Sequence, residues 1–545
     1  MKVLEFDAKK VQGNLTYELV KAIRKCRAEK YDKLVFAKDV YDIDFTFAEQ
    51  RNLCISNHGM NGPKRMGLLI EDMDGFEVDF NGSTLITKGK MTGIVVRNSK
   101  NVTIKNVILE NPETEFMQAR VVKTGEDFVD FEIELGGDQF ATSNGLMYAP
   151  CGYEFRIPQT TSIEFRGDTG ELEYGTGDFP IGFPWDVYNE KTKDGHFIVK
   201  NPTRIPPVGN VFVHTASRRF GCGIFCEDSS DLFFENVTVH SCQGMGLLAQ
   251  FCHNVTLDKF CTLRHGIQMY TANADATHFV HCTGLIKVEN GVFEGQLDDA
   301  LNIHGVYVRV IDRISSKELL LRQMHFQATG LKIFAPGDKV QALTPETLIP
   351  YTEKTVKSID VINDDIVKVT FKEDVDDIKV GDDLENLTKS ADLIFRKNIV
   401  RDNRARGMLI AAKGKVLIED NFFHASGAAI LFESDGKYWF ESGATNDVTI
   451  KNNVFDRCKY SKFGTAVVQF VKREAVEDGK YYHGAVNVVD NKFIMLNDLA
   501  VMFDNIENVT LKGNVIESDK PAIVDIKHCK NLDLQDGFTY QGEID

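Results

Sequence analysis

The sequence predicts an all-β protein: a right-handed parallel β-helix with two small antiparallel β modules inserted into it and an N-terminal capping helix. Two observations carry this prediction. A strand-like pattern recurs every 23 positions, and periods of 20–50 residues are typical of solenoids. The repeats show no helical period, so each coil consists of strands whose apolar side chains become buried only when the coils stack.

Each repeat has alternating apolar residues, then Asn, Asp or Gly, then apolar residues again. Copies begin at residues 101, 231, 254, 285, 392, 415, 447, 485, 508 and 531. The steps from 231 to 254, 392 to 415, 485 to 508 and 508 to 531 are all of 23 positions. The step from 254 to 285 is longer by eight, which predicts an eight-residue insertion. We place this insertion in the stretch 262–274.

Two stretches without the repeat interrupt the solenoid. Both alternate like strands, and both contain turn signals such as Gly167-Asp168 and Lys379-Val380-Gly381-Asp382. We interpret them as small antiparallel modules, barrel-like in form. The predicted organisation is therefore a cap with the first coils (1–111), module 1 (112–204), coils with the candidate site (205–305), module 2 (306–391) and the C-terminal coils (392–545).

One amphipathic helix is predicted near the N-terminus, from Leu15 to Arg27, with Asn14 as its N-cap. Its apolar face carries Leu19, Ala22, Ile23 and Cys26. An open end of a β-helix exposes sheet edges, so we expect this helix to cover the first coil.

The composition excludes several classes of function. A net charge of −17 over 545 residues argues against nucleic acid or an anionic membrane surface as a partner. No run of 18 apolar residues is present, so no transmembrane helix is expected. The N-terminus lacks the apolar core of a secretory signal, which predicts a cytoplasmic protein, or a secreted or periplasmic one if a signal has been removed. The eleven cysteines show no paired metal-binding spacing, so we expect reduced, mostly buried thiols.

Three aspartates are the candidate catalytic residues. Asp298 and Asp299 lie in Gln-Leu-Asp-Asp-Ala-Leu-Asn-Ile-His-Gly, and Asp275 precedes Asp298 by 23 positions, the period of the repeat. With the eight-residue insertion placed before Asp275, Asp275 and Asp298 have the same coil position and lie on neighbouring coils. Neighbouring coils are about 4.8 Å apart, and carboxylates at this distance cannot all ionise freely. Such clusters serve acid/base chemistry on glycosidic bonds. Other Asp-Asp pairs, at 364–365 and 376–377, are interpreted as solvated turns.

Five further residues are candidates for binding a sugar. Asn302 and His304 follow the aspartates on the same strand, where they are expected to hydrogen-bond sugar hydroxyls or to orient a carboxylate; a polar ladder on the outer face is the alternative. Arg406 lies almost level with the aspartates, and Glu433 and Trp439 follow one or two coils later. Arg218 and Arg219 are weaker candidates upstream.

At these residues the chain resembles glycoside hydrolase family 110, the α-1,3-galactosidases. The interrupted repeat, the two inserted modules and the Asp-Asp motif with an aspartate 23 positions earlier carry the resemblance, which covers essentially the whole length. A more distant similarity is to the polygalacturonase family of β-helices. Their Gly-His-Gly element is only partly present, as Ile303-His304-Gly305, and their Arg-Ile-Lys element is not evident, which weighs against uronate substrates.

The resemblance implies release of terminal α-1,3-linked galactose, as in blood-group-B or linear Gal-α-1,3-Gal glycans, with inversion and without metal or organic cofactor. It implies that Asp298 is the general acid and that Asp275 and Asp299 hold the attacking water. Two alternatives remain open: a β-helix glycosidase for another α-galactoside or a uronate, and a non-catalytic glycan-binding β-helix. The inserted modules also make a homo-oligomer an option.

Overall fold

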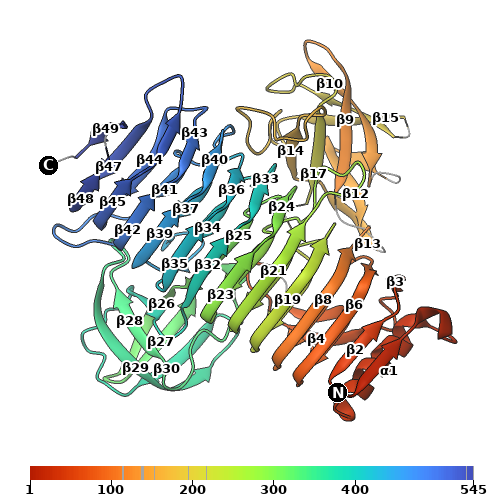
Figure 1. The fold of residues 1–545 in the computed structure, drawn as a ribbon, viewed down its shortest axis with the longest axis horizontal. Helices are drawn as coiled ribbons and strands as arrows, with labels where there is room; N and C mark the ends of the chain where they lie inside the picture. Colours follow the sequence, from red (N-terminus) through yellow and green to blue (C-terminus); the bar gives the residue numbers. More distant parts are fainter. Residues whose placement is uncertain are drawn as a thin grey trace.

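The protein is a stack of β-coils that runs from the N-terminal helix to the C-terminus, with two modules projecting from it (Figure 1). The computed structural model describes residues 1–59, 61–112, 116–136, 140–151, 154–193, 195–216, 218–535 and 537–543. The stack has three faces, each a ladder of mainly parallel strands. The prediction of an all-β parallel β-helix with inserted β modules is confirmed.

The first face comprises β1 (Val3–Phe6), β2 (Lys33–Phe36), β6 (Asp74–Thr87), β8 (Lys100–Glu110), β19 (Ser230–Val239), β21 (His253–Thr262), β23 (Thr283–Glu289), β32 (Ala391–Arg396), β35 (Lys415–Glu419), β39 (Asp447–Lys451), β42 (His483–Val489), β45 (Ile506–Lys512) and β48 (Asn531–Leu534). The second face uses the later parts of β6, β8, β19 and β21. It also contains β3 (Val40–Ile43), β24 (Val292–Glu294), β33 (Ile399–Arg401), β36 (Phe422–His424), β40 (Val454–Asp456), β43 (Lys492–Ile494) and β46 (Val515–Glu517).

The third face carries the candidate site at its edge. Its strands are β5 (Gly62–Glu71), β7 (Met91–Arg97), β18 (Ile224–Glu227), β20 (Leu247–Gln250), β22 (Thr277–Val280), β25 (Leu301–Val306), β34 (Met408–Ile410), β37 (Ile430–Phe432), β41 (Val468–Phe470), β44 (Leu499–Asp504), β47 (Ile523–Lys527) and β49 (Thr539–Gly542). All of these pair in parallel, while β4 (Glu49–Leu53) is antiparallel to β5 at one end. The apolar side chains of the three faces meet in one continuous core.

The Asn and Asp residues of the repeat have a structural role at the corner between the first two faces. Buried asparagines stack there in a column. The side-chain oxygen of the first, Asn398, accepts the backbone N–H of Gly291 at 2.8 Å, and each later one accepts the backbone N–H of the asparagine one coil earlier at 2.9–3.0 Å. The column comprises Asn398, Asn421, Asn453, Asn491 and Asn514. The residue before several of these asparagines has a positive φ, as at Asp420 (58°) and Asp490 (56°). Asp and Asn tolerate this conformation, which explains their recurrence at this turn.

The predicted capping helix is present as α1 (Leu15–Ala28). Asn14 is its N-cap, and the side-chain oxygen of Asn14 accepts the backbone N–H of Tyr17 at 3.0 Å. The face carrying Leu19, Ile23 and Cys26 is buried against the first coils, so the helix closes the end of the core.

Module 2 is a closed antiparallel barrel, as expected. Its strands are β26 (Val308–Ser315), β27 (Glu318–Gln323), β28 (Lys339–Leu343), β29 (Pro350–Val361), β30 (Ile366–Phe371) and β31 (Asp383–Asn386). The barrel encloses an apolar core of its own. The chain returns to the coils at β32, where Ala391 lies opposite Gly284.

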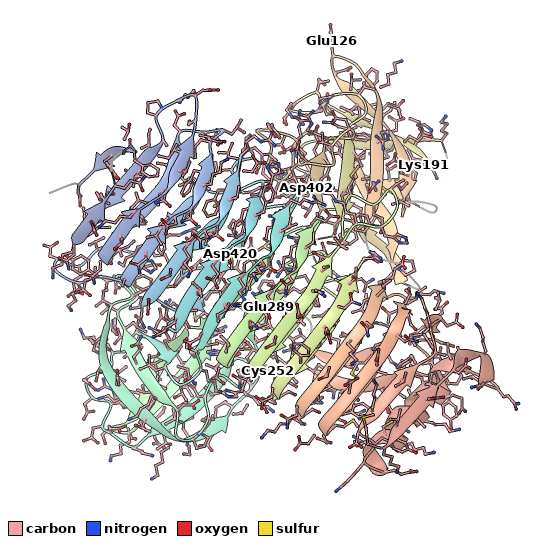
Figure 2. All side chains as sticks on the ribbon, viewed as in Figure 1. Glu126, Lys191, Cys252, Glu289, Asp402 and Asp420 are labelled. Atoms are coloured by element: carbon pink, nitrogen blue, oxygen red, sulfur yellow. The ribbon has the colours of Figure 1, made fainter. Side chains whose placement is uncertain are left out.

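Module 1 differs from the expectation in two respects. Within the described residues it is an open six-stranded antiparallel sheet with a separate three-stranded sheet, rather than a barrel. Its strands are β9 (Met117–Thr124), β10 (Phe128–Leu135), β11 (Ala141–Ser143), β12 (Leu146–Cys151), β13 (Glu154–Pro158), β14 (Thr161–Phe165), β15 (Tyr188–Lys193), β16 (His196–Lys200) and β17 (Val211–Thr215). The predicted boundary at 204 is also wrong, because β17 pairs antiparallel with β9 and β14 and so belongs to the module. Figure 2 shows the module extending away from the stack, with Glu126 at its tip.

Two expectations from composition can be compared with the structure. Ten of the eleven cysteines have side chains that the structure describes; each of these ten is a free thiol and seven are buried, which agrees with the prediction of reduced cysteines. Among the described helices, none has the length and apolar character needed to span a bilayer.

Candidate active site

Asp298 and Asp299 lie where the chain bends between β24 and β25, as expected if both are to reach one pocket. Asp275 lies just before β22 on the preceding coil. Thr277 of β22 is opposite Leu301 of β25, an offset of 24 positions, so Asp275 is level with Asp299. The prediction that Asp275 shares its coil position with Asp298 is therefore wrong by one residue.

The length of the inserted loop accounts for this shift. Thr262 is opposite Phe293, an offset of 31 positions, whereas the offset is 24 at Thr277. Seven of the eight extra residues therefore lie between Thr262 and Thr277, in the predicted place. The eighth extra residue lies after Asp275, at the register shift between β21 and β23. The offset at Asp275 is therefore 24 and not 23.

The three carboxylates form one compact cluster. Each carboxylate has one oxygen that lies within 4.8 Å of an oxygen of both other carboxylates. The backbone N–H of Asp299 donates to Oδ1 of Asp275 at 3.0 Å, which fixes the two residues across the coils. The side chain of Asp298 is 17% exposed, whereas those of Asp275 and Asp299 are 4% and 1% exposed. Asp298 is therefore the carboxylate most accessible to a ligand.

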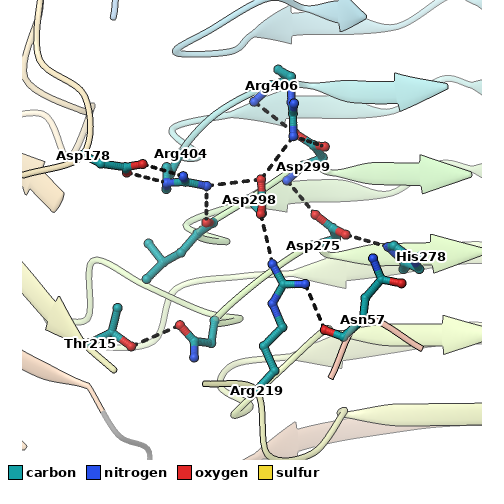
Figure 3. Close-up of polar contacts among 12 residues, drawn as sticks. Asn57, Asp178, Thr215, Arg219, Asp275, His278, Asp298, Asp299, Arg404 and Arg406 are labelled. Atoms are coloured by element: carbon teal, nitrogen blue, oxygen red, sulfur yellow. Dashed lines mark hydrogen bonds and ion pairs between the residues drawn. The ribbon is translucent and has the colours of Figure 1, made fainter. Parts of the chain in front are cut away.

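Three guanidinium groups surround the cluster (Figure 3). Arg406 makes a bidentate pair with Asp299, at 2.8 and 2.9 Å, and its backbone N–H donates to the same carboxylate at 3.2 Å. Asp298 lies 3.2 Å from Arg404, 3.5 Å from Arg406 and 3.4 Å from Arg219. Asp299 is thus held tightly, while the contacts of Asp298 are longer and looser.

Module 1 contributes to the site through Asp178. Its carboxylate forms a bidentate pair with Arg404, with both distances 2.7 Å. Arg404 also donates to the backbone carbonyl of Leu297 at 3.1 Å. The module therefore fixes the position of one of the guanidinium groups that face Asp298.

The environments separate the pKa values of the carboxyls. Burial and the Asp298 charge raise the pKa of Asp275 to about 8. Burial would also raise the pKa of Asp298, but the charges of Arg404, Arg406 and Arg219 outweigh it and hold this pKa below its usual value. Burial raises the pKa of Asp299 to about 8, against the opposing effect of Arg406.

The raised pKa values of Asp275 and Asp299 indicate that one of these two carboxyls is protonated at neutral pH. We assign this proton to Asp275. Asp299 accepts three N–H groups of Arg406, and such bonds favour a carboxylate. Asp275 accepts a single backbone N–H and has no guanidinium within hydrogen-bond distance among the described residues, and its other oxygen lies 2.7 Å from Nδ1 of His278, a nitrogen that can accept a proton from it.

The cluster lies in the wall of a cleft of about 850 Å³. Seven of the eight predicted site residues line it: Asp275, Asp298, Asp299, Asn302, Arg406, Glu433 and Trp439. Oδ1 of Asn302 is buried and has no hydrogen-bond partner among the described residues, which leaves it available to a ligand. Glu433 pairs with Arg473, and the ring of Trp439 lies 4.7 Å from that of His325 of module 2.

His304 is the exception. Its side chain is buried behind the cleft, where Nδ1 contacts the carbonyl of Gly305 at 2.6 Å and Nε2 contacts His278 at 3.0 Å. Of the two predicted roles, a contact with a sugar hydroxyl does not fit this position, whereas orienting a carboxylate does, because His304 contacts Asp275 through His278. Arg219, a weaker candidate, does line the cleft, whereas Arg218 is not among its lining residues.

Two family descriptions match this chain: GLAA-B beta-barrel domain II matches residues 318–384, in module 2, and a right-handed β-helix region matches residues 386–536. Among curated proteins, an alpha-1,3-galactosidase B of Phocaeicola vulgatus is 33% identical and covers 93% of this chain and 88% of its own. An alpha-1,3-galactosidase B of Bacteroides fragilis is 32% identical, covering 92% and 88%. The chain belongs to the α-1,3-galactosidase family. An alpha-1,3-galactosidase A of Shewanella woodyi is more distant, at 27% identity over 96% of this chain and 87% of its own.

Similarity to solved structures is weaker. A family 28 exopolygalacturonase of Yersinia enterocolitica has a TM-score of 0.42 and 10% identity, covering 98% of this chain and 79% of that chain. A similarity of this size has no bearing on substrate or mechanism. The sequence relatives alone therefore place the protein among the α-1,3-galactosidases.

The α-1,3-galactosidase site contains residues that sequence reasoning missed. Arg404, Asn57, Tyr438, Glu441, Lys462 and Gln469 line the cleft, and Asp178 and His278 contact Arg404 and Asp275 without lining it. Arg404 is two residues before Arg406 in the same Asn-Arg-Ala-Arg motif, so the motif gave a signal for it. Asp178 and Asn57 lie outside the repeat, and no spacing connects them to the aspartates.

The arrangement suits proton transfer better than cation binding. Both oxygens of Asp299 are bonded to Arg406, and Asp298 faces three guanidinium groups. A metal ion at the cluster would have to displace these positive charges.

Proposed function

We propose that this protein is an exo-acting glycoside hydrolase that releases terminal α-1,3-linked galactose from blood-group-B-like or linear Gal-α-1,3-Gal glycans. The observation that carries the proposal is the cluster of three carboxylates in the wall of the cleft, in a chain that is 33% identical to an alpha-1,3-galactosidase B over nearly its whole length. Hydrolysis of a glycosidic bond requires an acid for the leaving oxygen and a carboxylate that activates water or attacks the sugar.

We assign the acid role to Asp298 and the positioning of the water to Asp275 and Asp299. Asp298 is the most exposed of the three, so it is the one that a glycosidic oxygen in the cleft reaches first. Its contacts with the three arginines are 3.2–3.5 Å long, and a sugar that enters the cleft can loosen them. Asp298 takes up its proton as this happens, because the neighbouring guanidinium charges are what lower its pKa.

We also propose inversion at the anomeric carbon, on the basis of the family resemblance. Inverting enzymes usually hold their two carboxyl groups about 6.5–9.5 Å apart, and retaining enzymes about 5–5.5 Å apart. The nearest oxygens of this cluster lie within 4.8 Å of one another, which is shorter than either range. The anomer that is released first decides between the two.

A panel of substrates tests the proposal. Gal-α-1,3-Gal, Gal-α-1,4-Gal, the blood-group-B trisaccharide, p-nitrophenyl α-galactoside and an α-galacturonide are incubated with the protein, and the released sugar is quantified. We expect galactose from the α-1,3-linked substrates at least tenfold faster than from the α-1,4-linked one. Preferred release of galacturonate, or of α-1,4-linked galactose, contradicts the proposal. Binding without any release indicates a glycan-binding protein, and proton NMR of fresh product identifies the anomer.

A further inference from the structure

Two buried histidines lie directly behind Asp275. His278 is in β22 and His304 is in β25, on adjacent coils, and neither lines the cleft. Nδ1 of His278 lies 2.7 Å from Oδ2 of Asp275, and Nε2 of His278 lies 3.0 Å from Nε2 of His304. The two rings are nearly perpendicular, at 81°, so the nitrogen–nitrogen contact is a hydrogen bond between rings rather than a stacking contact.

The hydrogen bonds fix the number of protons in this chain. Nδ1 of His304 faces the carbonyl of Gly305 at 2.6 Å, and a carbonyl only accepts, so this nitrogen carries a proton. The contact between the two Nε2 atoms requires one proton, and the contact between His278 and Asp275 requires another. Three protons are therefore held, one more than an ionised Asp275 with two neutral histidines provides.

The charges around the cluster agree with this count. With the extra proton, the unit of Asp275, His278 and His304 is neutral. The carboxylates of Asp178, Asp298 and Asp299 then balance the guanidinium groups of Arg219, Arg404 and Arg406, and Glu441 is a further carboxylate at the far end of the contacts. The raised pKa of Asp275 is consistent with the same proton.

The chain of contacts leads back to the cleft at a second place. Nε2 of His304 lies 3.5 Å from Oε1 of Glu441, and Glu441 lines the cleft together with Asn57. The same oxygen of Glu441 accepts the side-chain N–H of Asn57 at 3.1 Å. The charged and titratable groups that face His278 are Asp275, Asp298, Arg219, His304, Glu441 and His58. Of these, only His304 connects His278 to the exit at Glu441.

We propose that Asp275, His278, His304 and Glu441 form a relay that carries the proton of the attacking water out of the site; this rests on the proposed function. When the water oxygen bonds to the anomeric carbon, its O–H bond breaks and the proton passes to Asp275. The proton that Asp275 already holds moves to Nδ1 of His278. The proton on Nε2 of His278 then moves to Nε2 of His304. His304 then delivers a proton to Glu441. One proton enters and one leaves, so the relay keeps its three protons. His278 ends with its proton on Nδ1 and returns to the Nε2 tautomer, which restores the hydrogen bond to His304, before the next turnover.

This relay separates the two proton paths of the reaction. Asp298 faces the cleft and gives its proton to the leaving oxygen, while the proton from water leaves behind the strands and emerges at Glu441. His278 and His304 touch no sugar; they act through Asp275 and are positioning residues.

His304→Gln tests the relay, because glutamine preserves a hydrogen bond to His278 but cannot pass a proton on. We expect kcat on Gal-α-1,3-Gal to fall at least tenfold, with KM within about twofold of wild type. We also expect added imidazole to restore part of kcat by supplying another proton acceptor. His281→Gln is the matched control, because His281 is also buried and bonds to the N–H of Val306, outside the relay. It should change kcat less than threefold and show no response to imidazole.

Glu441→Gln provides a second variant if His304→Gln does not fold, with the same expected loss and the same response to buffer. A kcat within twofold of wild type in the folded variants overturns the relay, and so does a loss that imidazole does not restore. Nitrogen-15 NMR of histidine-labelled wild-type protein tests the proton count without any substrate. We expect a proton on Nδ1 of His304 and a proton in the contact between the two Nε2 atoms. A spectrum with both histidines protonated on Nδ1 alone overturns the count. An inactive wild type with the expected NMR spectrum instead contradicts the proposed function.

Discussion

Asp298→Asn separates the acid from the residues that hold the water. The asparagine has nearly the same shape but supplies no proton to the leaving oxygen. General acid catalysis contributes about 10²–10⁴-fold, so we expect kcat/KM on Gal-α-1,3-Gal to fall about a thousandfold, equal to about 4 kcal/mol. A dinitrophenyl α-galactoside has a leaving group that needs no proton, so kcat/KM of the variant on this substrate should fall by no more than about tenfold.

The spacing of the cluster adds a second signature. Two carboxylate charges less than 4.8 Å apart interact by at least about 3 kcal/mol at an effective dielectric constant of 20, which is about two pKa units. Removing the Asp298 charge should therefore lower the pKa of the remaining pair by about that amount. On the dinitrophenyl substrate, the ionisation of this pair should move from about pH 8 in the wild type to about pH 6 in the variant. The rate of the variant should show no fall at alkaline pH, because no acid is needed.

The assay is initial-rate kinetics on both substrates from pH 5 to pH 10, with Asp275→Asn as the comparison. Because Asp275 holds the water, Asp275→Asn should reduce kcat/KM on both substrates by a similar factor. The reasoning is refuted if Asp298→Asn lowers kcat/KM as much on the dinitrophenyl substrate as on the disaccharide, while Asp275→Asn leaves kcat/KM on the dinitrophenyl substrate nearly unchanged. In that case Asp275 is the acid.

The other predictions concern pH, stability and module 1. Wild-type kcat/KM should fall as pH rises through about 8, where the cluster loses its last proton, and a pH–rate profile on Gal-α-1,3-Gal measures this. Because the folded pKa of Asp275 is raised, its contribution to stability is complete below about pH 4 and is lost as pH rises through about 8. Thermal unfolding should therefore show Asp275→Asn gaining Tm relative to wild type between pH 5 and pH 9. Asp178→Asn should lower kcat/KM about tenfold by releasing Arg404 while leaving Tm within about 2 °C, because the pair is partly exposed. Asn453→Ala should lower the free energy of unfolding by about 2–4 kcal/mol in a denaturant titration, because it strands buried donors and acceptors in the column.

The coils were predictable because the repeat converts distance along the sequence into distance in space. A step of one coil brings two residues to the strand spacing of about 4.8 Å, so Asp275 could be assigned to the cluster from sequence alone. The error of one residue arose because one of the eight extra residues lies after Asp275, at the register shift between β21 and β23, and not in the loop before it. Arg406 was found by the same reasoning, since it is one coil beyond Asp299.

Residues outside the period could not be found in this way. Asp178 reaches Arg404 across 226 residues, from a module whose orientation on the coils no repeat encodes. His278 lies only three residues after Asp275, but period reasoning compares equivalent positions on different coils and not neighbours on one strand. Its role depends on the partner that its ring meets, which is a property of the folded chain.

The column of residues that contains the cluster indicates why charge is concentrated at this place. Strand register puts Met245, Asp275, Asp299, Arg406 and Ala428 at the same level on successive coils, each two residues before its strand on the third face. Met245 and Ala428 are fully buried, so an apolar or small side chain satisfies packing at this level. Burying a charge there carries a desolvation penalty that packing alone does not require. The three charged positions are consecutive, face one cleft and compensate one another, so their arrangement is explained by the reaction in the cleft rather than by the stability of the coils.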